Sequence, residues 1–366
     1  MKLPVSSKNG VSEVRALTGL RGVAALYVVF FHYFSPVRLT NPFMCLLGHG
    51  YLAVDLFFVL SGFVMALNYA GLFSQGVRGA AVRIFLSRRV ARIYPLYLLT
   101  LLIATGLVGI GYLNFTAGSL ARTFWPNLLM VQNWGNWESI ETPAWSISTE
   151  WFAYMLFPFL LTWSFYRSRA RVFTLFILSI SGLVSLASFF TSPYDHLKVF
   201  DLTQGYPSLI RCVSEFTLGI IAYRIKDSRF GAVAKDMPWL PLTLVLLLVV
   251  LLALKRTDVL VVLLFPLLVL VLDGKRNFLN HSLGSRVPEF LGLVSYSVYL
   301  VHYLLVPVLN GVDSYVRRHG RSHSHSYAVA VVFPLMMLCA SCTYFIVEIP
   351  GRRSLRVLLD SDRRTV

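Results

Sequence analysis

The first residues that could do chemistry are an arginine and a histidine on one apolar segment, Arg21 and His32. They are eleven residues apart, a spacing that puts both on one face of a helix and separates them by about 16 Å along its axis. A neutral imidazole suits the work of a general base, and a guanidinium suits an anion. The alternative interpretation is an interfacial arginine and a hydrogen-bonded core histidine.

Further ionisable residues stand inside apolar segments, where a charge is costly and points to function by default. They are Asp55, Glu150, Arg211, Glu215, His302 and Glu348. Their positions along the chain place all but the last in the outer half of the membrane, at the depth of His32, so we expect one buried polar cluster. Two simpler interpretations stay open. Arg211 and Glu215 could pair with each other at i,i+4, and Asp55 could be a partner for an arginine or for a helix N-terminus.

A basic segment, RIFLSRRVARIYPLY, carries Arg83, Arg88, Arg89 and Arg92 directly before an apolar run. Arg89 and Arg92 share a helix face at i,i+3. Planar guanidinium groups bind phosphate with two parallel hydrogen bonds, so this face could hold a phosphorylated nucleotide. The positive-inside rule, by which cytoplasmic segments of membrane proteins are rich in lysine and arginine, would also explain the segment.

The elements that carry these residues are apolar helices. The chain is 56% hydrophobic and 14% charged, with a mean hydropathy of +0.67, whereas soluble domains are about 25% charged. We therefore predict an all-α polytopic membrane protein. The ten predicted spans are 15–35, 51–70, 93–113, 144–165, 172–191, 207–224, 238–254, 258–272, 289–310 and 327–348. The pair 238–254 and 258–272 could instead form one re-entrant hairpin, because only three residues, KRT, interrupt its apolar sequence.

The distribution of lysine and arginine predicts the orientation. The segments that would share a side with the N-terminus hold 23 of these residues, and the opposite segments hold 8. The positive-inside rule then places both termini in the cytoplasm. We expect a cytoplasmic tail over 1–14, a transmembrane domain over 15–348 and a basic cytoplasmic tail over 349–366.

Two functional classes are disfavoured by these patterns. The net charge of +16 lies between apolar segments rather than on one soluble face, so we do not expect a nucleic-acid partner. The four cysteines show no disulfide framework. Cys339 and Cys342 lie inside an apolar span, where small residues pack helices together, and we expect no metal site.

Six blocks in order resemble the acyltransferase family 3 membrane proteins, which are O-acyltransferases of lipopolysaccharide, capsules, nodulation factors and some antibiotics. The blocks are LTGLRGVAALYVVFFHY with Arg21 and His32, GYLAVDLFFVLSGFVMA with Asp55, FLSRRVARIYPLY with Arg89 and Arg92, TPAWSISTEWFAYMLFP with Trp145, Ser146 and Glu150, LGLVSYSVYLVH with Tyr296 and His302, and VEIPGRR. The resemblance spans about residues 14–353. It implies ten core helices with cytoplasmic termini, in agreement with the charge distribution.

The resemblance implies transfer of an acyl group, expected to be acetyl, from cytoplasmic acyl-CoA to a hydroxyl of a carbohydrate or glycolipid acceptor at a bacterial inner membrane. Arg89 and Arg92, together with Arg21, would hold the donor's phosphates, and His32 would be the general base. Glu150 or Asp55 would orient His32. The residues expected at the acceptor are Trp145, Ser146, Arg211, Tyr296 and His302. Some members carry a fused SGNH-type hydrolase domain; without it, we expect transfer to finish in the membrane domain or on another protein.

Alternatives remain at two levels. An acyl-enzyme could form first on His32 or Ser146, although we favour direct transfer. A transporter or flippase could use the same charges as a relay, and internal inverted repeats would favour it, but the sequence shows none. A membrane scaffold that presents substrate to another enzyme would tolerate loss of His32.

Overall fold

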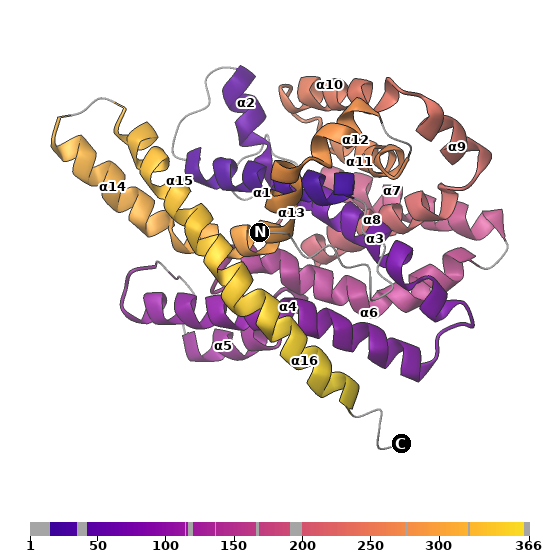
Figure 1. The fold of residues 1–366 in the computed structure, drawn as a ribbon, viewed down its shortest axis with the longest axis horizontal. Coiled ribbons are helices and arrows are strands. Elements are labelled where there is room, and N and C mark those ends of the chain that lie inside the picture. Colours follow the sequence, from indigo (N-terminus) through magenta and orange to yellow (C-terminus); the bar gives the residue numbers. More distant parts are fainter. Residues whose placement is uncertain are drawn as a thin grey trace.

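The computed structural model describes residues 15–34, 42–113, 115, 120–135, 137–165, 168–190, 200–274, 277–320 and 323–361. Within these residues every regular element is helical (Figure 1), as the sequence predicts. The predicted tail 1–14 lies outside the described residues.

The helices that carry the predicted spans are mostly about 20 residues long. They are α1 (Arg15–Phe34), α3 (Ala53–Tyr69), α4 (Gly79–Gly109), α6 (Trp145–Phe165), α7 (Arg169–Phe189), α8 (Gly205–Ile225), α10 (Leu240–Leu252), α11 (Asp258–Leu272), α13 (Arg286–Leu304) and α15 (Ser324–Thr343). Shorter helices are α2 (Pro42–Gly48), α5 (Leu120–Leu128), α9 (Arg229–Asp236), α12 (Phe278–Leu283), α14 (Val306–Arg318) and α16 (Ile349–Ser361). Single turns are η1 (Gly50–Leu52), η2 (Gly71–Phe73), η3 (Gln132–Trp134), η4 (Thr142–Ala144) and η5 (Tyr344–Glu348), the last a π-helical turn.

Several helices have the length and apolar character of membrane spans. Among the described residues, five segments do so, and seven if each of two bent pairs counts as one span. The five are α1, Gly50–Tyr69, α4, α7 and Ser324–Leu359. α11 is apolar but has only 15 residues. α6 and α8 have 21 residues each but are not among these five segments. Ten spans and cytoplasmic termini therefore stay predictions.

Two boundaries differ from the predicted ones by many residues. The span predicted over 289–310 is broken, because α13 and α14 meet at a 52° bend where α14 starts at Val306-Pro307. The span predicted to start at 238 agrees with α10, which starts at Leu240 and meets α9 at an 85° bend beside Pro238. Proline cannot donate the hydrogen bond that would continue a helix. The helix predicted to start at 93 begins at Gly79, so the basic segment forms its first half.

Glycines set the closest helix contacts, and these contacts position polar residues. A Cβ atom on Gly22 of α1 would lie 2.6 Å from the backbone nitrogen of Gly292 of α13. A Cβ atom on Gly62 of α3 would lie 1.9 Å from the carbonyl oxygen of Phe216 of α8. Small residues let helix backbones approach in this way inside a membrane. α1 is thereby held against α13, and α3 against α8.

The outward surfaces of several helices are apolar. Leu102 of α4, Phe173 of α7, Leu246 of α10 and Leu338 of α15 are all more than half exposed. α8, by contrast, is buried along most of its length and carries Arg211 and Glu215 inside the protein. Apolar residues outside and charges inside are the pattern expected of a helical bundle in lipid.

Candidate functional site

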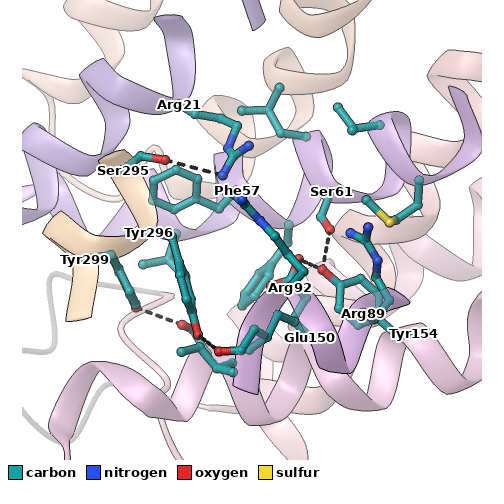
Figure 2. A pocket seen from close by; sticks show the side chains of 18 residues that line it. Arg21, Phe57, Ser61, Arg89, Arg92, Glu150, Tyr154, Ser295, Tyr296 and Tyr299 are labelled. Carbon is teal, nitrogen blue, oxygen red and sulfur yellow. Dashed lines mark hydrogen bonds between the residues drawn. The ribbon is translucent and has the colours of Figure 1, made fainter. Parts of the chain in front are cut away.

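A cavity of about 140 Å³ lies between α1, α3, α4, α6 and α13 (Figure 2). Its polar lining consists of Arg21, Ser61, Arg89, Arg92, Ser146, Glu150, Tyr154, Ser295, Tyr296 and Tyr299. Six of the eleven predicted site residues line this cavity: Arg21, Arg89, Arg92, Ser146, Glu150 and Tyr296. The cavity thus brings the three arginines predicted to bind the donor and one carboxylate into a single space. The cavity is the structure's candidate for the reaction site.

The three arginines of the cavity are held by different partners. Arg21 donates to the Ser295 hydroxyl at 3.3 Å. Arg89 donates to the Tyr69 hydroxyl at 2.9 Å, and its guanidinium lies 5.2 Å from the centre of the Tyr69 ring. Arg92 forms a salt bridge of 2.8 Å with the buried Glu348 of η5. Arg92 is therefore charge-compensated from within the protein.

Glu150 is the one carboxylate among the residues that line this cavity. It accepts a hydrogen bond of 2.6 Å from the hydroxyl of Tyr154, one turn later on α6. The Tyr154 oxygen is in turn 3.3 Å from the Ser61 hydroxyl, which can donate to it. The structure thus groups Glu150 with the arginines of the predicted cytoplasmic side, whereas its chain position had suggested the outer polar cluster.

The two predicted histidines contact each other across the α1–α13 interface. The Nε2 of His302 lies 3.1 Å from the Nδ1 of His32. The Nδ1 of His302 lies 3.2 Å from the carbonyl oxygen of Val298, an atom that can only accept. In a neutral ring this Nδ1 therefore carries the proton, and its Nε2 accepts from the Nδ1–H of His32. The lone pair of a neutral His32 is then on Nε2, the tautomer that a general base at this atom requires.

A pair of hydroxyls connects the cavity with the histidines. The Ser146 and Tyr299 oxygens are 2.8 Å apart, and each is 3.1 Å from the carbonyl oxygen of Pro143. Both residues line the cavity, and the Tyr299 ring lies 6.0 Å from the ring of His302. Neither histidine is among the described residues that line the cavity. The histidine pair is separated from the cavity by Tyr299, which precedes His302 by about one turn on α13.

Asp55 and Arg211 form a buried ion pair between α3 and α8. The Arg211 Nε donates to one Asp55 oxygen at 2.7 Å, and a second guanidinium nitrogen donates to the other oxygen. Glu215 lies 3.9 Å from the same guanidinium, which also lies 5.3 Å from the Trp145 ring. The structure therefore agrees with both simpler interpretations of these charges. Asp55 is the partner of an arginine, with both of its oxygens bound by Arg211, and Glu215 lies next to Arg211 at i+4. Trp145 and Arg211 are both buried, and neither is among the residues that line the cavity.

Several site residues were not singled out from the sequence: Tyr69, Tyr154, Ser295 and Tyr299. Tyr154 stands at i+4 from Glu150 and Tyr299 at i−3 from His302, spacings that share a helix face. That spacing was a usable signal. Tyr296, which was predicted, lines the cavity and donates to the Ile93 carbonyl oxygen at 2.8 Å.

Comparison with known proteins identifies the family of the chain. The acyltransferase family 3 model, which describes an acyltransferase domain, matches residues 14–347. The chain belongs to acyltransferase family 3. The resemblance drawn from the six sequence blocks is therefore confirmed.

Relatives within acyltransferase family 3 include named acyltransferases. The chain is 35% identical over 158 residues to acyltransferase MdmB of Streptomyces mycarofaciens, covering 40% of this chain and 39% of MdmB. It is 44% identical over 88 residues to protein 2 in the picA locus of Rhizobium radiobacter, covering 23% of this chain and 40% of that protein. It is 24% identical over 365 residues to O-acetyltransferase OatA of Staphylococcus aureus, covering 92% of this chain and 57% of OatA.

These matches span between about two fifths and three fifths of the relatives' own lengths. No solved structure matches the chain. Family membership therefore rests on sequence, and the arrangement of the family's residues in space comes from the contacts described above.

Proposed function

We propose that this chain is a membrane O-acyltransferase that moves an acyl group, expected to be acetyl, from acyl-CoA to a hydroxyl of a sugar-containing acceptor. The observation that carries the proposal is the His32–His302 pair, one helical turn from the end of a buried cavity lined by three arginines. The names of the relatives support acyl transfer.

The donor would enter at the arginines. A coenzyme thioester carries several phosphates on one end of a long, thin arm, and the cavity offers guanidinium groups at Arg21, Arg89 and Arg92. The arm would extend between the helices toward Ser146 and Tyr299, which lie at the end of the cavity nearest the histidines. The acyl carbonyl would stop there, where the Ser146 or the Tyr299 hydroxyl, on turning away from the Pro143 carbonyl oxygen, can donate a hydrogen bond to the acyl oxygen as negative charge develops.

The reaction would be direct transfer with His32 as the base. His32 Nε2 takes the proton of the acceptor hydroxyl while the hydroxyl oxygen bonds to the thioester carbon. The bond between that carbon and sulfur breaks, and the coenzyme leaves as a thiolate. The protonated His32 returns the proton to the thiolate, so the products are an ester and a free thiol. His302 Nε2 and the Val28 carbonyl oxygen both lie 3.1 Å from His32 Nδ1, and as acceptors they keep the base in the required tautomer.

Mass spectrometry of surface glycans and lipids tests the proposal directly. Cells with the protein should carry a glycan or glycolipid heavier by one acyl group, and cells without it should lack that species. The mass increment names the acyl group, and the fragment that bears it names the acceptor. A flippase would instead change the side on which a glycan accumulates while leaving its mass the same, and that result would overturn the proposal.

A further inference from the structure

A second, smaller cavity of about 50 Å³ lies beside the first at the start of α4. Its lining residues are Asn68, Tyr69, Arg88, Arg89, Ala91, Arg352 and Arg356. Arg89 also lines the larger cavity, so the two spaces meet at this side chain. We call the four arginines of the smaller cavity the arginine cradle.

The C-terminal helix builds half of the cradle. α16 packs against α4 (Figure 1), and the contact is close at Gly351, where a Cβ atom would lie 2.5 Å from the Cβ atom of Pro95. The salt bridge between Arg92 and Glu348 joins α4 to η5, the turn that leads into α16. Arg352 and Arg356, at i and i+4 on α16, are thereby brought to Arg88 and Arg89 of α4.

The cradle concentrates positive charge without an acidic partner. None of the residues that line it is a carboxylate, and the nearby Glu348 is paired with Arg92. The guanidinium of Arg352 lies close enough to those of Arg92, Arg89 and Arg356 for their positive charges to repel it. Like charges this close raise the free energy of the site unless an anion joins them.

Two buried nitrogens in the cradle also have no bonding partner. The Nε atoms of Arg88 and Arg89 are inaccessible to solvent and form no hydrogen bond within the part of the chain that the structure describes. A buried donor without a partner is costly. Topology alone explains basic residues at a cytoplasmic surface, but it does not explain two buried guanidinium nitrogens on α4 beside a space that α16 lines with two further arginines.

We infer that the arginine cradle binds a phosphate group of the donor's nucleotide part, leaving the rest of the donor to pass Arg89 into the larger cavity. Guanidinium groups bind phosphate through paired, charge-assisted hydrogen bonds, which the four arginines of the cradle are placed to supply. The inference rests on the proposed function for the identity of the ligand. Arg352 and Arg356 lie beyond residue 347, where the match to the family model ends. Arg352 belongs to the VEIPGRR block, whereas Arg356 lies outside all six blocks of the resemblance.

Binding of CoA to the purified full-length protein tests the inference. The test variant is Arg352→Gln with Arg356→Gln. The matched control is Arg353→Gln, an exposed residue of the same helix that does not line the cradle. We expect the double variant to bind CoA with an affinity roughly 10- to 100-fold lower than that of the unaltered protein. Inorganic pyrophosphate should compete with CoA for the unaltered protein, and its affinity for the double variant should fall by a similar factor. Arg353→Gln should bind CoA as the unaltered protein does, and all three proteins should have the same melting temperature.

Three results would overturn the inference. The first is unchanged CoA affinity in the double variant. The second is an equal loss in Arg353→Gln, which would assign the effect to general surface charge. The third is an anionic lipid, such as phosphatidylglycerol, that is bound to the unaltered protein but is lost from the double variant, with CoA affinity the same in both proteins. The cradle would then bind a lipid headgroup.

The outcome is separable from that of the proposed function. Loss of CoA binding in the double variant, with no acyl transfer by the unaltered protein, would keep the cradle and refute the acyltransferase. Acyl transfer by the unaltered protein, with unchanged CoA binding in the double variant, would keep the acyltransferase and refute the cradle.

Discussion

His302 of α13 holds His32 of α1 through a contact of 3.1 Å between two ring nitrogens. The residues lie 270 positions apart in the chain, and the close approach of Gly22 to Gly292 brings their helices together. In this arrangement His302 is a positioning residue, since it is fully buried and contacts the proposed base rather than the cavity.

Replacement of His302 tests this role. His302→Gln keeps an oxygen that can accept from His32 Nδ1, so transfer should fall by only about tenfold, less than the roughly 10²–10⁴-fold contribution of a general base. The pH profile of transfer should shift, because the partner of the base has changed, whereas a purely structural role would leave the profile in place. His281→Gln, at an exposed site on α12, is the control. Complete loss in His302→Gln with activity retained in His32→Gln would place the base on α13.

The two charges of the Asp55–Arg211 pair should not be equivalent. Arg211→Gln leaves Asp55 and Glu215 as two buried carboxylates, whereas Asp55→Asn leaves Arg211 with Glu215 still 3.9 Å away. Loss of one partner of a buried pair costs about 3–5 kcal/mol, and we expect Arg211→Gln to be at the upper end and Asp55→Asn below it. Thermal melting in detergent measures the difference. Equal or reversed effects would show that Glu215 does not share the guanidinium.

Glu141, in the loop before α6, should make stability depend on pH. Burial raises its pKa from 4.5 to about 8, with Thr100 opposing the shift only in part. The folded chain therefore favours the neutral acid, so stability should be greatest below about pH 4.5, fall as pH rises to about 8, and then level off. The slope is at most about 1.4 kcal/mol per pH unit.

The neutral variant Glu141→Gln should remove this slope and be more stable than the unaltered protein at pH 8. Asp227→Asn, whose parent side chain is 82% exposed, should leave the slope in place. Melting temperatures measured across this pH range decide the matter, and an unchanged slope in Glu141→Gln would show that another group is responsible.

The two predicted donor-binding arginines should differ in their contributions. Arg89→Ala should weaken CoA binding by roughly tenfold or more, because Arg89 lines both cavities. Arg92→Ala should weaken it less, because Glu348 already neutralises that guanidinium. Arg89→Lys should restore only part of the affinity, since an ammonium lacks the planar fork. A larger loss in Arg92→Ala, in protein that melts normally, would reverse the assignment.

The sequence was informative about the family and about most of the helices. Long apolar runs interrupted by Arg21, Asp55 and Glu150 identify helices whose charges must face other helices. The bend between α13 and α14 was less visible, although Pro307 stands at it. Proline is tolerated inside several other helices of the chain, including α4 at Pro95, so its presence alone does not predict a break.

The grouping of the charges was harder to predict than their presence. Chain position gives the depth of a residue in a span but not the direction in which its side chain points around the bundle. Glu150 and Asp55 were expected together for that reason, yet Glu150 faces the arginine-lined cavity while Asp55 faces Arg211 of α8. The partner of Arg92 depends on the π-helical turn that ends at Glu348, which the sequence did not indicate.

The most direct test of the account supplies acyl-labelled acetyl-CoA to inverted membrane vesicles that contain the protein and its own acceptors. Label in base-labile ester and release of free CoA thiol are measured together. The account predicts equal amounts of both with the unaltered protein and a loss of at least about 10²-fold in His32→Gln, with membrane levels unchanged. Transfer by His32→Gln at the rate of the unaltered protein would contradict the central claim that His32 is the base.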